Sequence, residues 1–360
     1  MTWLLFDKSR LKNILIRDKT GGKSLPRRKL LDSLIKKYGT NKEYTAIFLD
    51  HILTHYKDNP RYEVYLDAEL GALKRSRELI KSLSQKFEND HLFRGKDCLD
   101  IGSSAGNSLI AFIENGAARA TGIEICEGRY QTASINVNGC KDEIRGKIQM
   151  LREDIQNEEI NGIGQFDIIF CTDVLEHVQE PRQTIKQICR LLKNSPEAFA
   201  YIRLRNFQHP ENVIHEPHYD FPGMVLLPEE LSKAYYECCK PSDPIDYEAL
   251  HWRSFYDYQT MFKSFGKKCT LFDKINPEAS CIVYVEDEIK KLLLAFDEFS
   301  EKHSLDRSLK KEIDKYIDAY RTRIETSIHE YRSAEDRLLL EMFYVNFVVY
   351  DLVMLVTKET

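Results

Sequence analysis

The sequence predicts an α/β fold in which helices flank a mainly parallel sheet. Two neighbouring features carry this prediction. Residues Cys98–Gly106 read C-L-D-I-G-S-S-A-G, a short apolar run that leads into a turn of small residues and then a helix-like segment over 107–115. A second apolar run, Ala120–Ile125, reads A-T-G-I-E-I and contains an acid, Glu124. This order of strand, turn, helix and strand is typical of nucleotide-binding folds, in which the turn lets the backbone approach a ligand and the acid binds a ribose diol.

The residues of the turn discriminate between nucleotide classes. The dinucleotide fingerprint G-x-G-x-x-G fails because Ser104 and Asn107 occupy its second and third glycine positions. Asp100 would repel a pyrophosphate, and the sequence has no G-x-x-x-x-G-K-[ST] run for a triphosphate. S-adenosylmethionine fits better, because its ribose suits Glu124 and an acid favours its cationic ammonium and sulfonium groups.

The turn resembles the first motif of the class I S-adenosylmethionine-dependent methyltransferases, which is an acid followed by alternating glycines. Asp100, Gly102 and Gly106 match this motif, and Ser104 stands where the family has its middle glycine. Serine is small enough for such a turn. The donor-binding residues expected in this part of the chain are Asp100, Gly102, Ser103, Ser104, Gly106 and Glu124.

Two later motifs extend the resemblance. Residues 147–154 read K-I-Q-M-L-R-E-D, and the resemblance implies that Asp154 holds the adenine amino group while Ile155 packs near its ring. Residues 166–181 read F-D-I-I-F-C-T-D-V-L-E-H-V-Q-E-P, a strand and polar turn like the fourth strand of methyltransferases that act on small molecules; Thr172 at its end is a further expected donor contact. Together these motifs imply a Rossmann-like, seven-stranded class I methyltransferase sheet.

We expect the chain to be organised in four parts. Residues 1–92 form a helical N-terminal extension that serves as a lid, and residues 93–284 form the core. Residues 285–344 are a helical insertion, and residues 345–360 supply the last strand. An apolar stripe at helical spacing marks the insertion, and it packs either on the protein's own core or on a second subunit of a homodimer; it comprises Ile313, Tyr316, Ile317, Tyr320, Ile324, Ile328 and Tyr331.

The composition of the chain limits the classes of binding partner and the cellular compartment that we expect. The formal net charge is −5, which disfavours nucleic acid as a partner. Nine cysteines without a C-x-x-C pair indicate reduced, mostly buried thiols and a cytoplasmic protein. No transmembrane segment is expected. Residues 8–29 hold nine Lys or Arg against one acid, which is read either as a solvated basic edge or as a weak contact with a membrane surface.

Histidines supply the candidates for catalysis. Methyl transfer to oxygen or nitrogen needs a base, and histidine is the usual one near neutral pH. His177 follows the fourth strand, where related enzymes touch substrate, although the position also suits a helix start bonded to backbone. His215 and His218 lie in a loop rich in proline and aromatic residues. The predicted catalytic residues are therefore His177, His215 and His218.

A divalent cation is a further hypothesis for this region. Asp173, Glu176 and His177 read D-x-x-E-H, which resembles the E-x-x-E-H metal run of small-RNA 3′-terminal 2′-O-methyltransferases and of ubiquinone-pathway O-methyltransferases. Oxygen ligands with an imidazole suit Mg²⁺, Mn²⁺ or Zn²⁺, and His215 or His218 would be the fourth ligand. The same run occurs in methyltransferases without a metal, so the metal ligands stay unknown.

The function predicted from these features is methyl transfer from S-adenosylmethionine to an oxygen atom of a small-molecule or glycan-precursor acceptor, with a histidine as general base. No [DN]-P-P-[YFW] or Pro-Cys pair follows the fourth strand, which argues against adenine or cytosine methylation. The alternatives are a metal-assisted RNA ribose 2′-O-methyltransferase and a donor-binding protein without catalysis.

Overall fold

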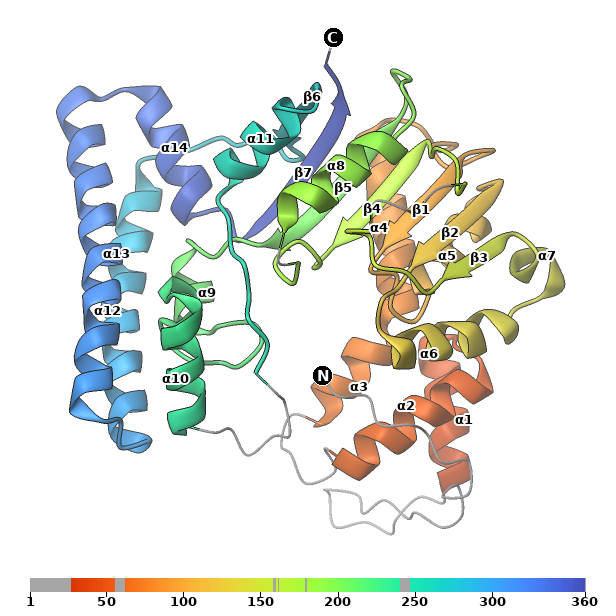
Figure 1. The fold of residues 1–360 in the computed structure, drawn as a ribbon, viewed down its shortest axis with the longest axis horizontal. Helices are drawn as coiled ribbons and strands as arrows, with labels where there is room; N and C mark the ends of the chain where they lie inside the picture. Colours follow the sequence, from red (N-terminus) through yellow and green to blue (C-terminus); the bar gives the residue numbers. More distant parts are fainter. Residues whose placement is uncertain are drawn as a thin grey trace. The chain divides into compact units, whose positions relative to one another are not determined.

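The computed structural model describes residues 27–55, 62–157, 160, 162–178, 180–239 and 247–359. Most of the basic segment 8–29 lies outside them, so the predicted membrane-surface contact is not addressed by the structure. The chain divides into two compact units, drawn in Figure 1. The amino-terminal unit comprises the described residues within 27–170 and 191–193, and the carboxy-terminal unit comprises those within 171–190 and 194–359.

Seven strands form one sheet in the order β3-β2-β1-β4-β5-β7-β6. β1, β2 and β3 pair in parallel, whereas β7 lies antiparallel between β5 and β6. The predicted seven-stranded α/β fold is thereby confirmed. The strands are β1 Asp97–Ile101, β2 Arg119–Ile123, β3 Ile148–Leu151, β4 Ile168–Thr172, β5 Phe199–Arg205, β6 Lys267–Leu271 and β7 Asp351–Lys358.

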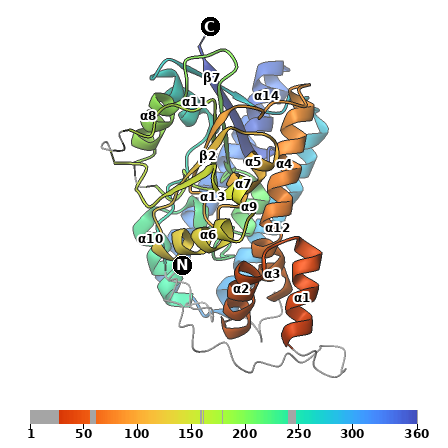
Figure 2. The same cartoon turned by 90° about the vertical axis from the view of Figure 1, so that its right-hand side faces the viewer.

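Helices of the amino-terminal unit precede the first strand and connect the next ones. α1, α2 and α3 gather beside α6 in both views (Figures 1 and 2). One continuous helix over 64–83 is expected from the apolar spacing, but the structure divides it at Gly71, where the Arg75 guanidinium donates to the backbone carbonyls of Asp67 and Ala68. The helices are α1 Arg27–Tyr38, α2 Lys42–His55, α3 Tyr62–Leu70, α4 Ala72–Lys86, α5 Asn107–Glu114, α6 Glu127–Asn138 and α7 Asp142–Arg145.

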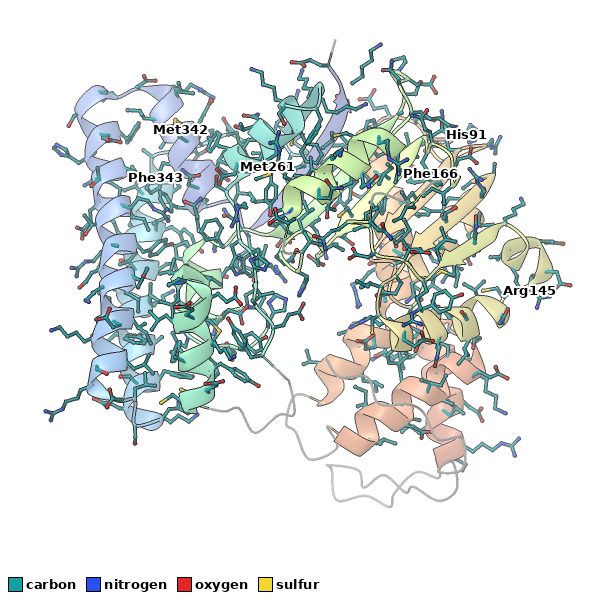
Figure 3. The ribbon with its side chains drawn as sticks, viewed as in Figure 1. His91, Arg145, Phe166, Met261, Met342 and Phe343 are labelled. Carbon is teal, nitrogen blue, oxygen red and sulfur yellow. The ribbon has the colours of Figure 1, made fainter. Side chains whose placement is uncertain are left out.

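The inserted helices of the carboxy-terminal unit run from Ser280 to Phe347, somewhat beyond the predicted 285–344. Most of the predicted stripe on α13 is buried in this unit's own core, together with residues of α12 and α14. On α14, Phe343 is buried in that core and the neighbouring Met342 is exposed (Figure 3). The homodimer stays a prediction. The helices are α8 Pro181–Leu191, α9 Pro210–Ile214, α10 Glu229–Cys239, α11 Phe255–Lys263, α12 Ser280–Lys302, α13 Arg307–Ala334 and α14 Arg337–Phe347.

Two further expectations concern the cysteines, expected as reduced thiols, and the helices, none of which is expected to span a membrane. All nine cysteines lie within the described residues and none forms a disulfide; Cys98, Cys171 and Cys281 are buried. Within the described ranges, every helix is too short or too polar to cross a bilayer.

Candidate functional site

The turn after β1 takes a backbone conformation that few residues adopt. Gly102, Ser104 and Gly106 have φ angles of 70°, 47° and 72°, in the left-handed region that favours glycine. Ser104 holds this conformation with the help of two hydrogen bonds. Its N–H donates to Glu124 Oε2 over 2.8 Å, and its hydroxyl accepts from the Arg129 guanidinium. These two hydrogen bonds thus hold Ser104, which stands where the family has its middle glycine, in the left-handed conformation.

Glu124 follows directly on β2 and is built into the same turn. Its buried carboxylate accepts the N–H of Ser104 and, over 2.9 Å, the N–H of Cys126. The N–H groups of Gly102 and Ser103 both donate to the Ile123 carbonyl, which fixes the turn against the end of β2. A carboxylate has about four acceptor positions. Glu124 therefore keeps capacity for the two hydroxyls of a ribose.

Asp100 is buried on β1 beside this carboxylate. Burial raises its pKa to about 7, the hydrogen bond donated by the Ser108 hydroxyl opposes that rise, and the charge of Glu124 adds to it. The side chain is therefore close to half-ionised at neutral pH. A cation placed beside it would favour the ionised form, which is the property expected of a site for a cationic ligand.

The other predicted donor contacts lie at the ends of β3 and β4. Glu124 N–H donates to the Leu151 carbonyl, so the ends of β2 and β3 are adjacent. Beyond β3, Asp154 is half-buried and accepts the N–H of Gln156 over 2.9 Å, and Ile155 is buried. Thr172 is the last residue of β4 and belongs to the carboxy-terminal unit.

The carboxy-terminal unit brings two of the predicted histidines together. The rings of His177 and His218 meet edge to face with centroids 4.9 Å apart. Each Nδ1 atom contacts a carboxylate: His177 with Glu248 over 3.2 Å, and His218 with Glu216 over 2.8 Å. Neither glutamate belongs to a sequence motif, because Glu216 lies in the loop after α9 and Glu248 lies in the chain before α11. We call this group the histidine pair.

Glu216 is the more rigid of the two carboxylates. Its side chain is only 1% exposed, and it also accepts the backbone N–H groups of His218 and Tyr219. An ionised carboxylate accepts but cannot donate. It therefore places the proton of a neutral His218 on Nδ1 and leaves Nε2 as an acceptor, as in a catalytic carboxylate–histidine couple.

His177 has a more open partner, since Glu248 is 51% exposed. Burial lowers the pKa of His177, but the hydrogen bond to Glu248 and the charge of Glu176 outweigh it, so that the pKa is raised. The same hydrogen bond lowers the pKa of Glu248. Residue 177 lies in a turn, and the next helix, α8, begins at Pro181.

His215 stands apart from this arrangement. Its side chain is 73% exposed, and its Nδ1 atom contacts Asp220 over 2.9 Å.

The metal hypothesis also lacks its ligand set. Asp173 has a left-handed φ of 54° and its carboxylate pairs with Arg203. Across the described ranges, no three His, Cys, Asp or Glu side chains are placed to hold a metal ion. A divalent cation therefore stays a prediction that the geometry does not support.

A small pocket lies beside the histidine pair in the same unit. Glu216 and Glu248, the two partners of the pair, line it together with aromatic rings. The ring of Trp252 is 6.1 Å from that of His218. The remaining polar and aromatic residues of its wall are Tyr219, Tyr247, Glu229 and Ser232.

Comparisons with known proteins agree on one class. A family model described as a methyltransferase domain matches residues 72–266, more than half of the chain. The ubiquinone biosynthesis O-methyltransferase of Coxiella burnetii (strain RSA 493) is 31% identical over 139 residues, which are 36% of this chain and 53% of that protein. The corresponding enzyme of Neisseria meningitidis is 27% identical over 124 residues, 34% of this chain and 49% of that protein. The chain thus spans about half the length of these curated relatives.

Among solved structures, a putative sarcosine dimethylglycine methyltransferase from Galdieria sulphuraria aligns with a TM-score of 0.42 and 10% identity, over 82% of this chain and 88% of that one. The YcgJ protein from Bacillus subtilis aligns with a TM-score of 0.42 and 13% identity, over 80% of this chain and 99% of that one.

Proposed function

Because this chain belongs to the family of methyltransferase domains, we propose that it methylates an oxygen atom of a small, hydroxylated acceptor. The match confirms the predicted enzyme class, a methyltransferase that uses S-adenosylmethionine. The observation that carries the proposed chemistry is the histidine pair, in which each imidazole is held at Nδ1 by a carboxylate. The acceptor and the identity of the base are the parts that need experiment.

The amino-terminal unit has the residues that would hold the donor. Glu124 would accept hydrogen bonds from the ribose, and the carboxyl of Asp100 would favour a cationic group. The left-handed turn at 102–106 lets backbone approach a ligand closely. When bound, S-adenosylmethionine supplies a methyl group on a positively charged sulfur. The contribution of the amino-terminal unit to this step is one of binding and orientation.

We assign the base to His218. A hydroxyl acceptor must lose its proton, and a positioned base typically accelerates such a step about 10²- to 10⁴-fold. Glu216 holds the proton of His218 on Nδ1, so Nε2 is the atom that would accept the proton. His177 is the second candidate, because its raised pKa favours the imidazolium form, which cannot accept a proton.

The pocket beside the pair favours an uncharged acceptor that carries hydroxyl groups. Its wall includes the rings of Tyr219, Tyr247 and Trp252, and three glutamates could accept hydrogen bonds from hydroxyls. The same carboxylates would repel a phosphate or a carboxylate, which argues against RNA. Transfer to oxygen agrees with the names of the relatives, which are O-methyltransferases.

The test has two stages. Calorimetry with S-adenosylmethionine and its demethylated product should show binding to the purified full chain. Transfer of a labelled methyl group to hydroxylated small molecules from a cell extract should then fall about 10²- to 10⁴-fold in His218→Ala, with donor affinity unchanged. His215→Ala is the matched control and should retain its rate, because His215 is exposed and lies outside the pair. A His218→Ala rate equal to that of the wild type would disprove the assignment of the base.

A further inference from the structure

We infer that α2 supports donor binding, and that Tyr44 and Asn41 are positioning residues for the turn at 102–107. This inference rests on the proposed binding of the donor at that turn. It goes beyond a lid that merely covers the site, because the contacts described below end on the turn itself.

Tyr44 connects α2 to the start of α5. Its side chain is fully buried, and its hydroxyl accepts the Asn107 side-chain amide over 3.0 Å. The same hydroxyl donates to the backbone carbonyl of Glu69 on α3 over 3.3 Å. Asn107 is the first residue of α5, directly after the turn. One tyrosine therefore holds the end of the turn against two helices of the N-terminal segment.

Asn136 on α6 continues this network to the middle of the turn. Its side-chain amide donates to the Ala105 carbonyl over 2.8 Å and to Asn107 Oδ1 over 3.1 Å. Asn41, one residue before α2, donates from its side chain to Asn136 O and to Asn136 Oδ1, over 3.1 Å each. The N-terminal segment thus bonds directly to Asn107 and to Asn136, which in turn bonds to the Ala105 carbonyl.

Packing ties the same elements together. Ala105 belongs to the apolar core of α1, α2 and α3, although it is a residue of the turn. Asn41 packs closely on Gly139, where a Cβ atom would come within 2.5 Å of its side chain. Polar groups buried in this way are costly to leave without partners. A change in α2 is therefore transmitted to the turn as a loss of defined hydrogen bonds.

The turn needs this outside support because three of its residues have left-handed φ angles. The left-handed conformation is sterically unfavourable for a serine at position 104. Bonds to Ala105 and Asn107, on the far side of Ser104 from β1, restrict the turn to the shape seen here. We therefore expect the network to affect donor binding more than the chemical step.

The test compares two tyrosine substitutions within the same helical segment. Tyr44→Phe removes the hydroxyl that holds Asn107, whereas Tyr38→Phe removes a hydroxyl that donates to Asp67 Oδ1 over 2.8 Å and has no bond to the turn. Donor dissociation constants are measured by calorimetry on full-length chains, with melting temperatures and kcat at saturating donor. We expect the dissociation constant of Tyr44→Phe to rise roughly five- to twentyfold, the range for one lost buried hydrogen bond. Tyr38→Phe should stay within about twofold of the wild type on the same scale.

Gly139→Ala is the second variant, and it keeps the test decisive if Tyr44→Phe is poorly folded. Its φ of −74° suits alanine, so the change acts by displacing Asn41. The donor KM should rise while kcat changes little. Equal donor affinity in wild type, Tyr44→Phe and Gly139→Ala would overturn the inference and leave the proposed function intact. A wild-type chain that fails to bind the donor would overturn both.

Discussion

The donor turn and the histidine pair are held in different ways. The turn is fixed mainly by buried, uncharged side chains, because Tyr44, Asn107 and Asn136 bond to it or beside it. Its carboxylate partner, Glu124, accepts the backbone N–H of Ser104. The histidine pair is held by ionisable carboxylates, one buried and one half exposed. A site that only binds gains from a rigid, dry frame, whereas a group that must take up and release a proton needs a charged partner and access to water. The contrast predicts that variants of the turn change affinity and variants of the pair change rate.

The largest effect is expected at the buried carboxylate of the pair. Glu216→Gln replaces an acceptor with a side chain that can donate, so the proton of His218 is no longer held on Nδ1. We expect kcat to fall about 10²-fold or more, with donor affinity unchanged. Glu248→Gln is the matched control and should lose less than about tenfold, because Glu248 is half exposed and can be replaced by water. Equal losses in the two variants would remove the distinction between the carboxylates.

An intermediate effect is expected at the acid of the turn. Glu124→Gln keeps the size of the side chain but removes the charge that accepts the N–H groups of Ser104 and Cys126. Hydrogen bonds to charged groups contribute about 1.5–3 kcal/mol, so donor affinity should fall roughly 10- to 150-fold. At saturating donor, kcat should recover to near the wild-type value. If kcat falls while the dissociation constant stays the same, the turn is not the donor site.

The smallest effect concerns pH. The pKa of Asp100 is raised from 3.8 to about 7, so the side chain is mostly neutral below that pH and mostly ionised above it. Only the ionised form attracts a cation. Donor affinity should therefore rise by about tenfold between pH 6 and 8, and binding near pH 6 should release close to one proton.

The proton release is measured by calorimetry in buffers of different ionisation enthalpy. Asp100→Asn retains the shape of the side chain but cannot titrate, and it should show weaker binding that no longer changes with pH in this range. A wild-type affinity that stays flat between pH 6 and 8 would show that no cation is bound beside Asp100.

The sequence supports prediction of the turn because its information is local. Gly102, Ser104 and Gly106 are two residues apart, and parallel pairing of β1 with β2 places Glu124 beside them. The seven-stranded sheet follows from the same succession of motifs. Asp100 and Glu124 can therefore be placed together from the sequence, whereas the contact of Arg129 with Ser104 has no motif of its own.

The histidine pair could be predicted only in part, because its geometry depends on the loop after α9 and on residues 247–253 before α11. His177 and His218 are predicted, but Glu216 and Glu248 are found only when the loops are folded. The D-x-x-E-H run suggests a metal set on spacing alone. In the structure, the left-handed backbone at Asp173 directs that carboxylate to Arg203. Spacing of residues cannot predict a single backbone angle of this kind.

The position of β7 has a consequence for how the polypeptide is made. β6 at Lys267–Leu271 is an edge strand whose neighbour is β7, and β7 is also the neighbour of β5. During translation, β5 and β6 therefore leave the ribosome well before the strand that joins them. The long helices at 280–347 emerge in that interval, and α12 and α13 pack on α9 and α10, which have already been made. Completion of the sheet thus waits until the residues of β7 have been made after those helices, and until then the strand edges that β7 pairs with are open to aggregation.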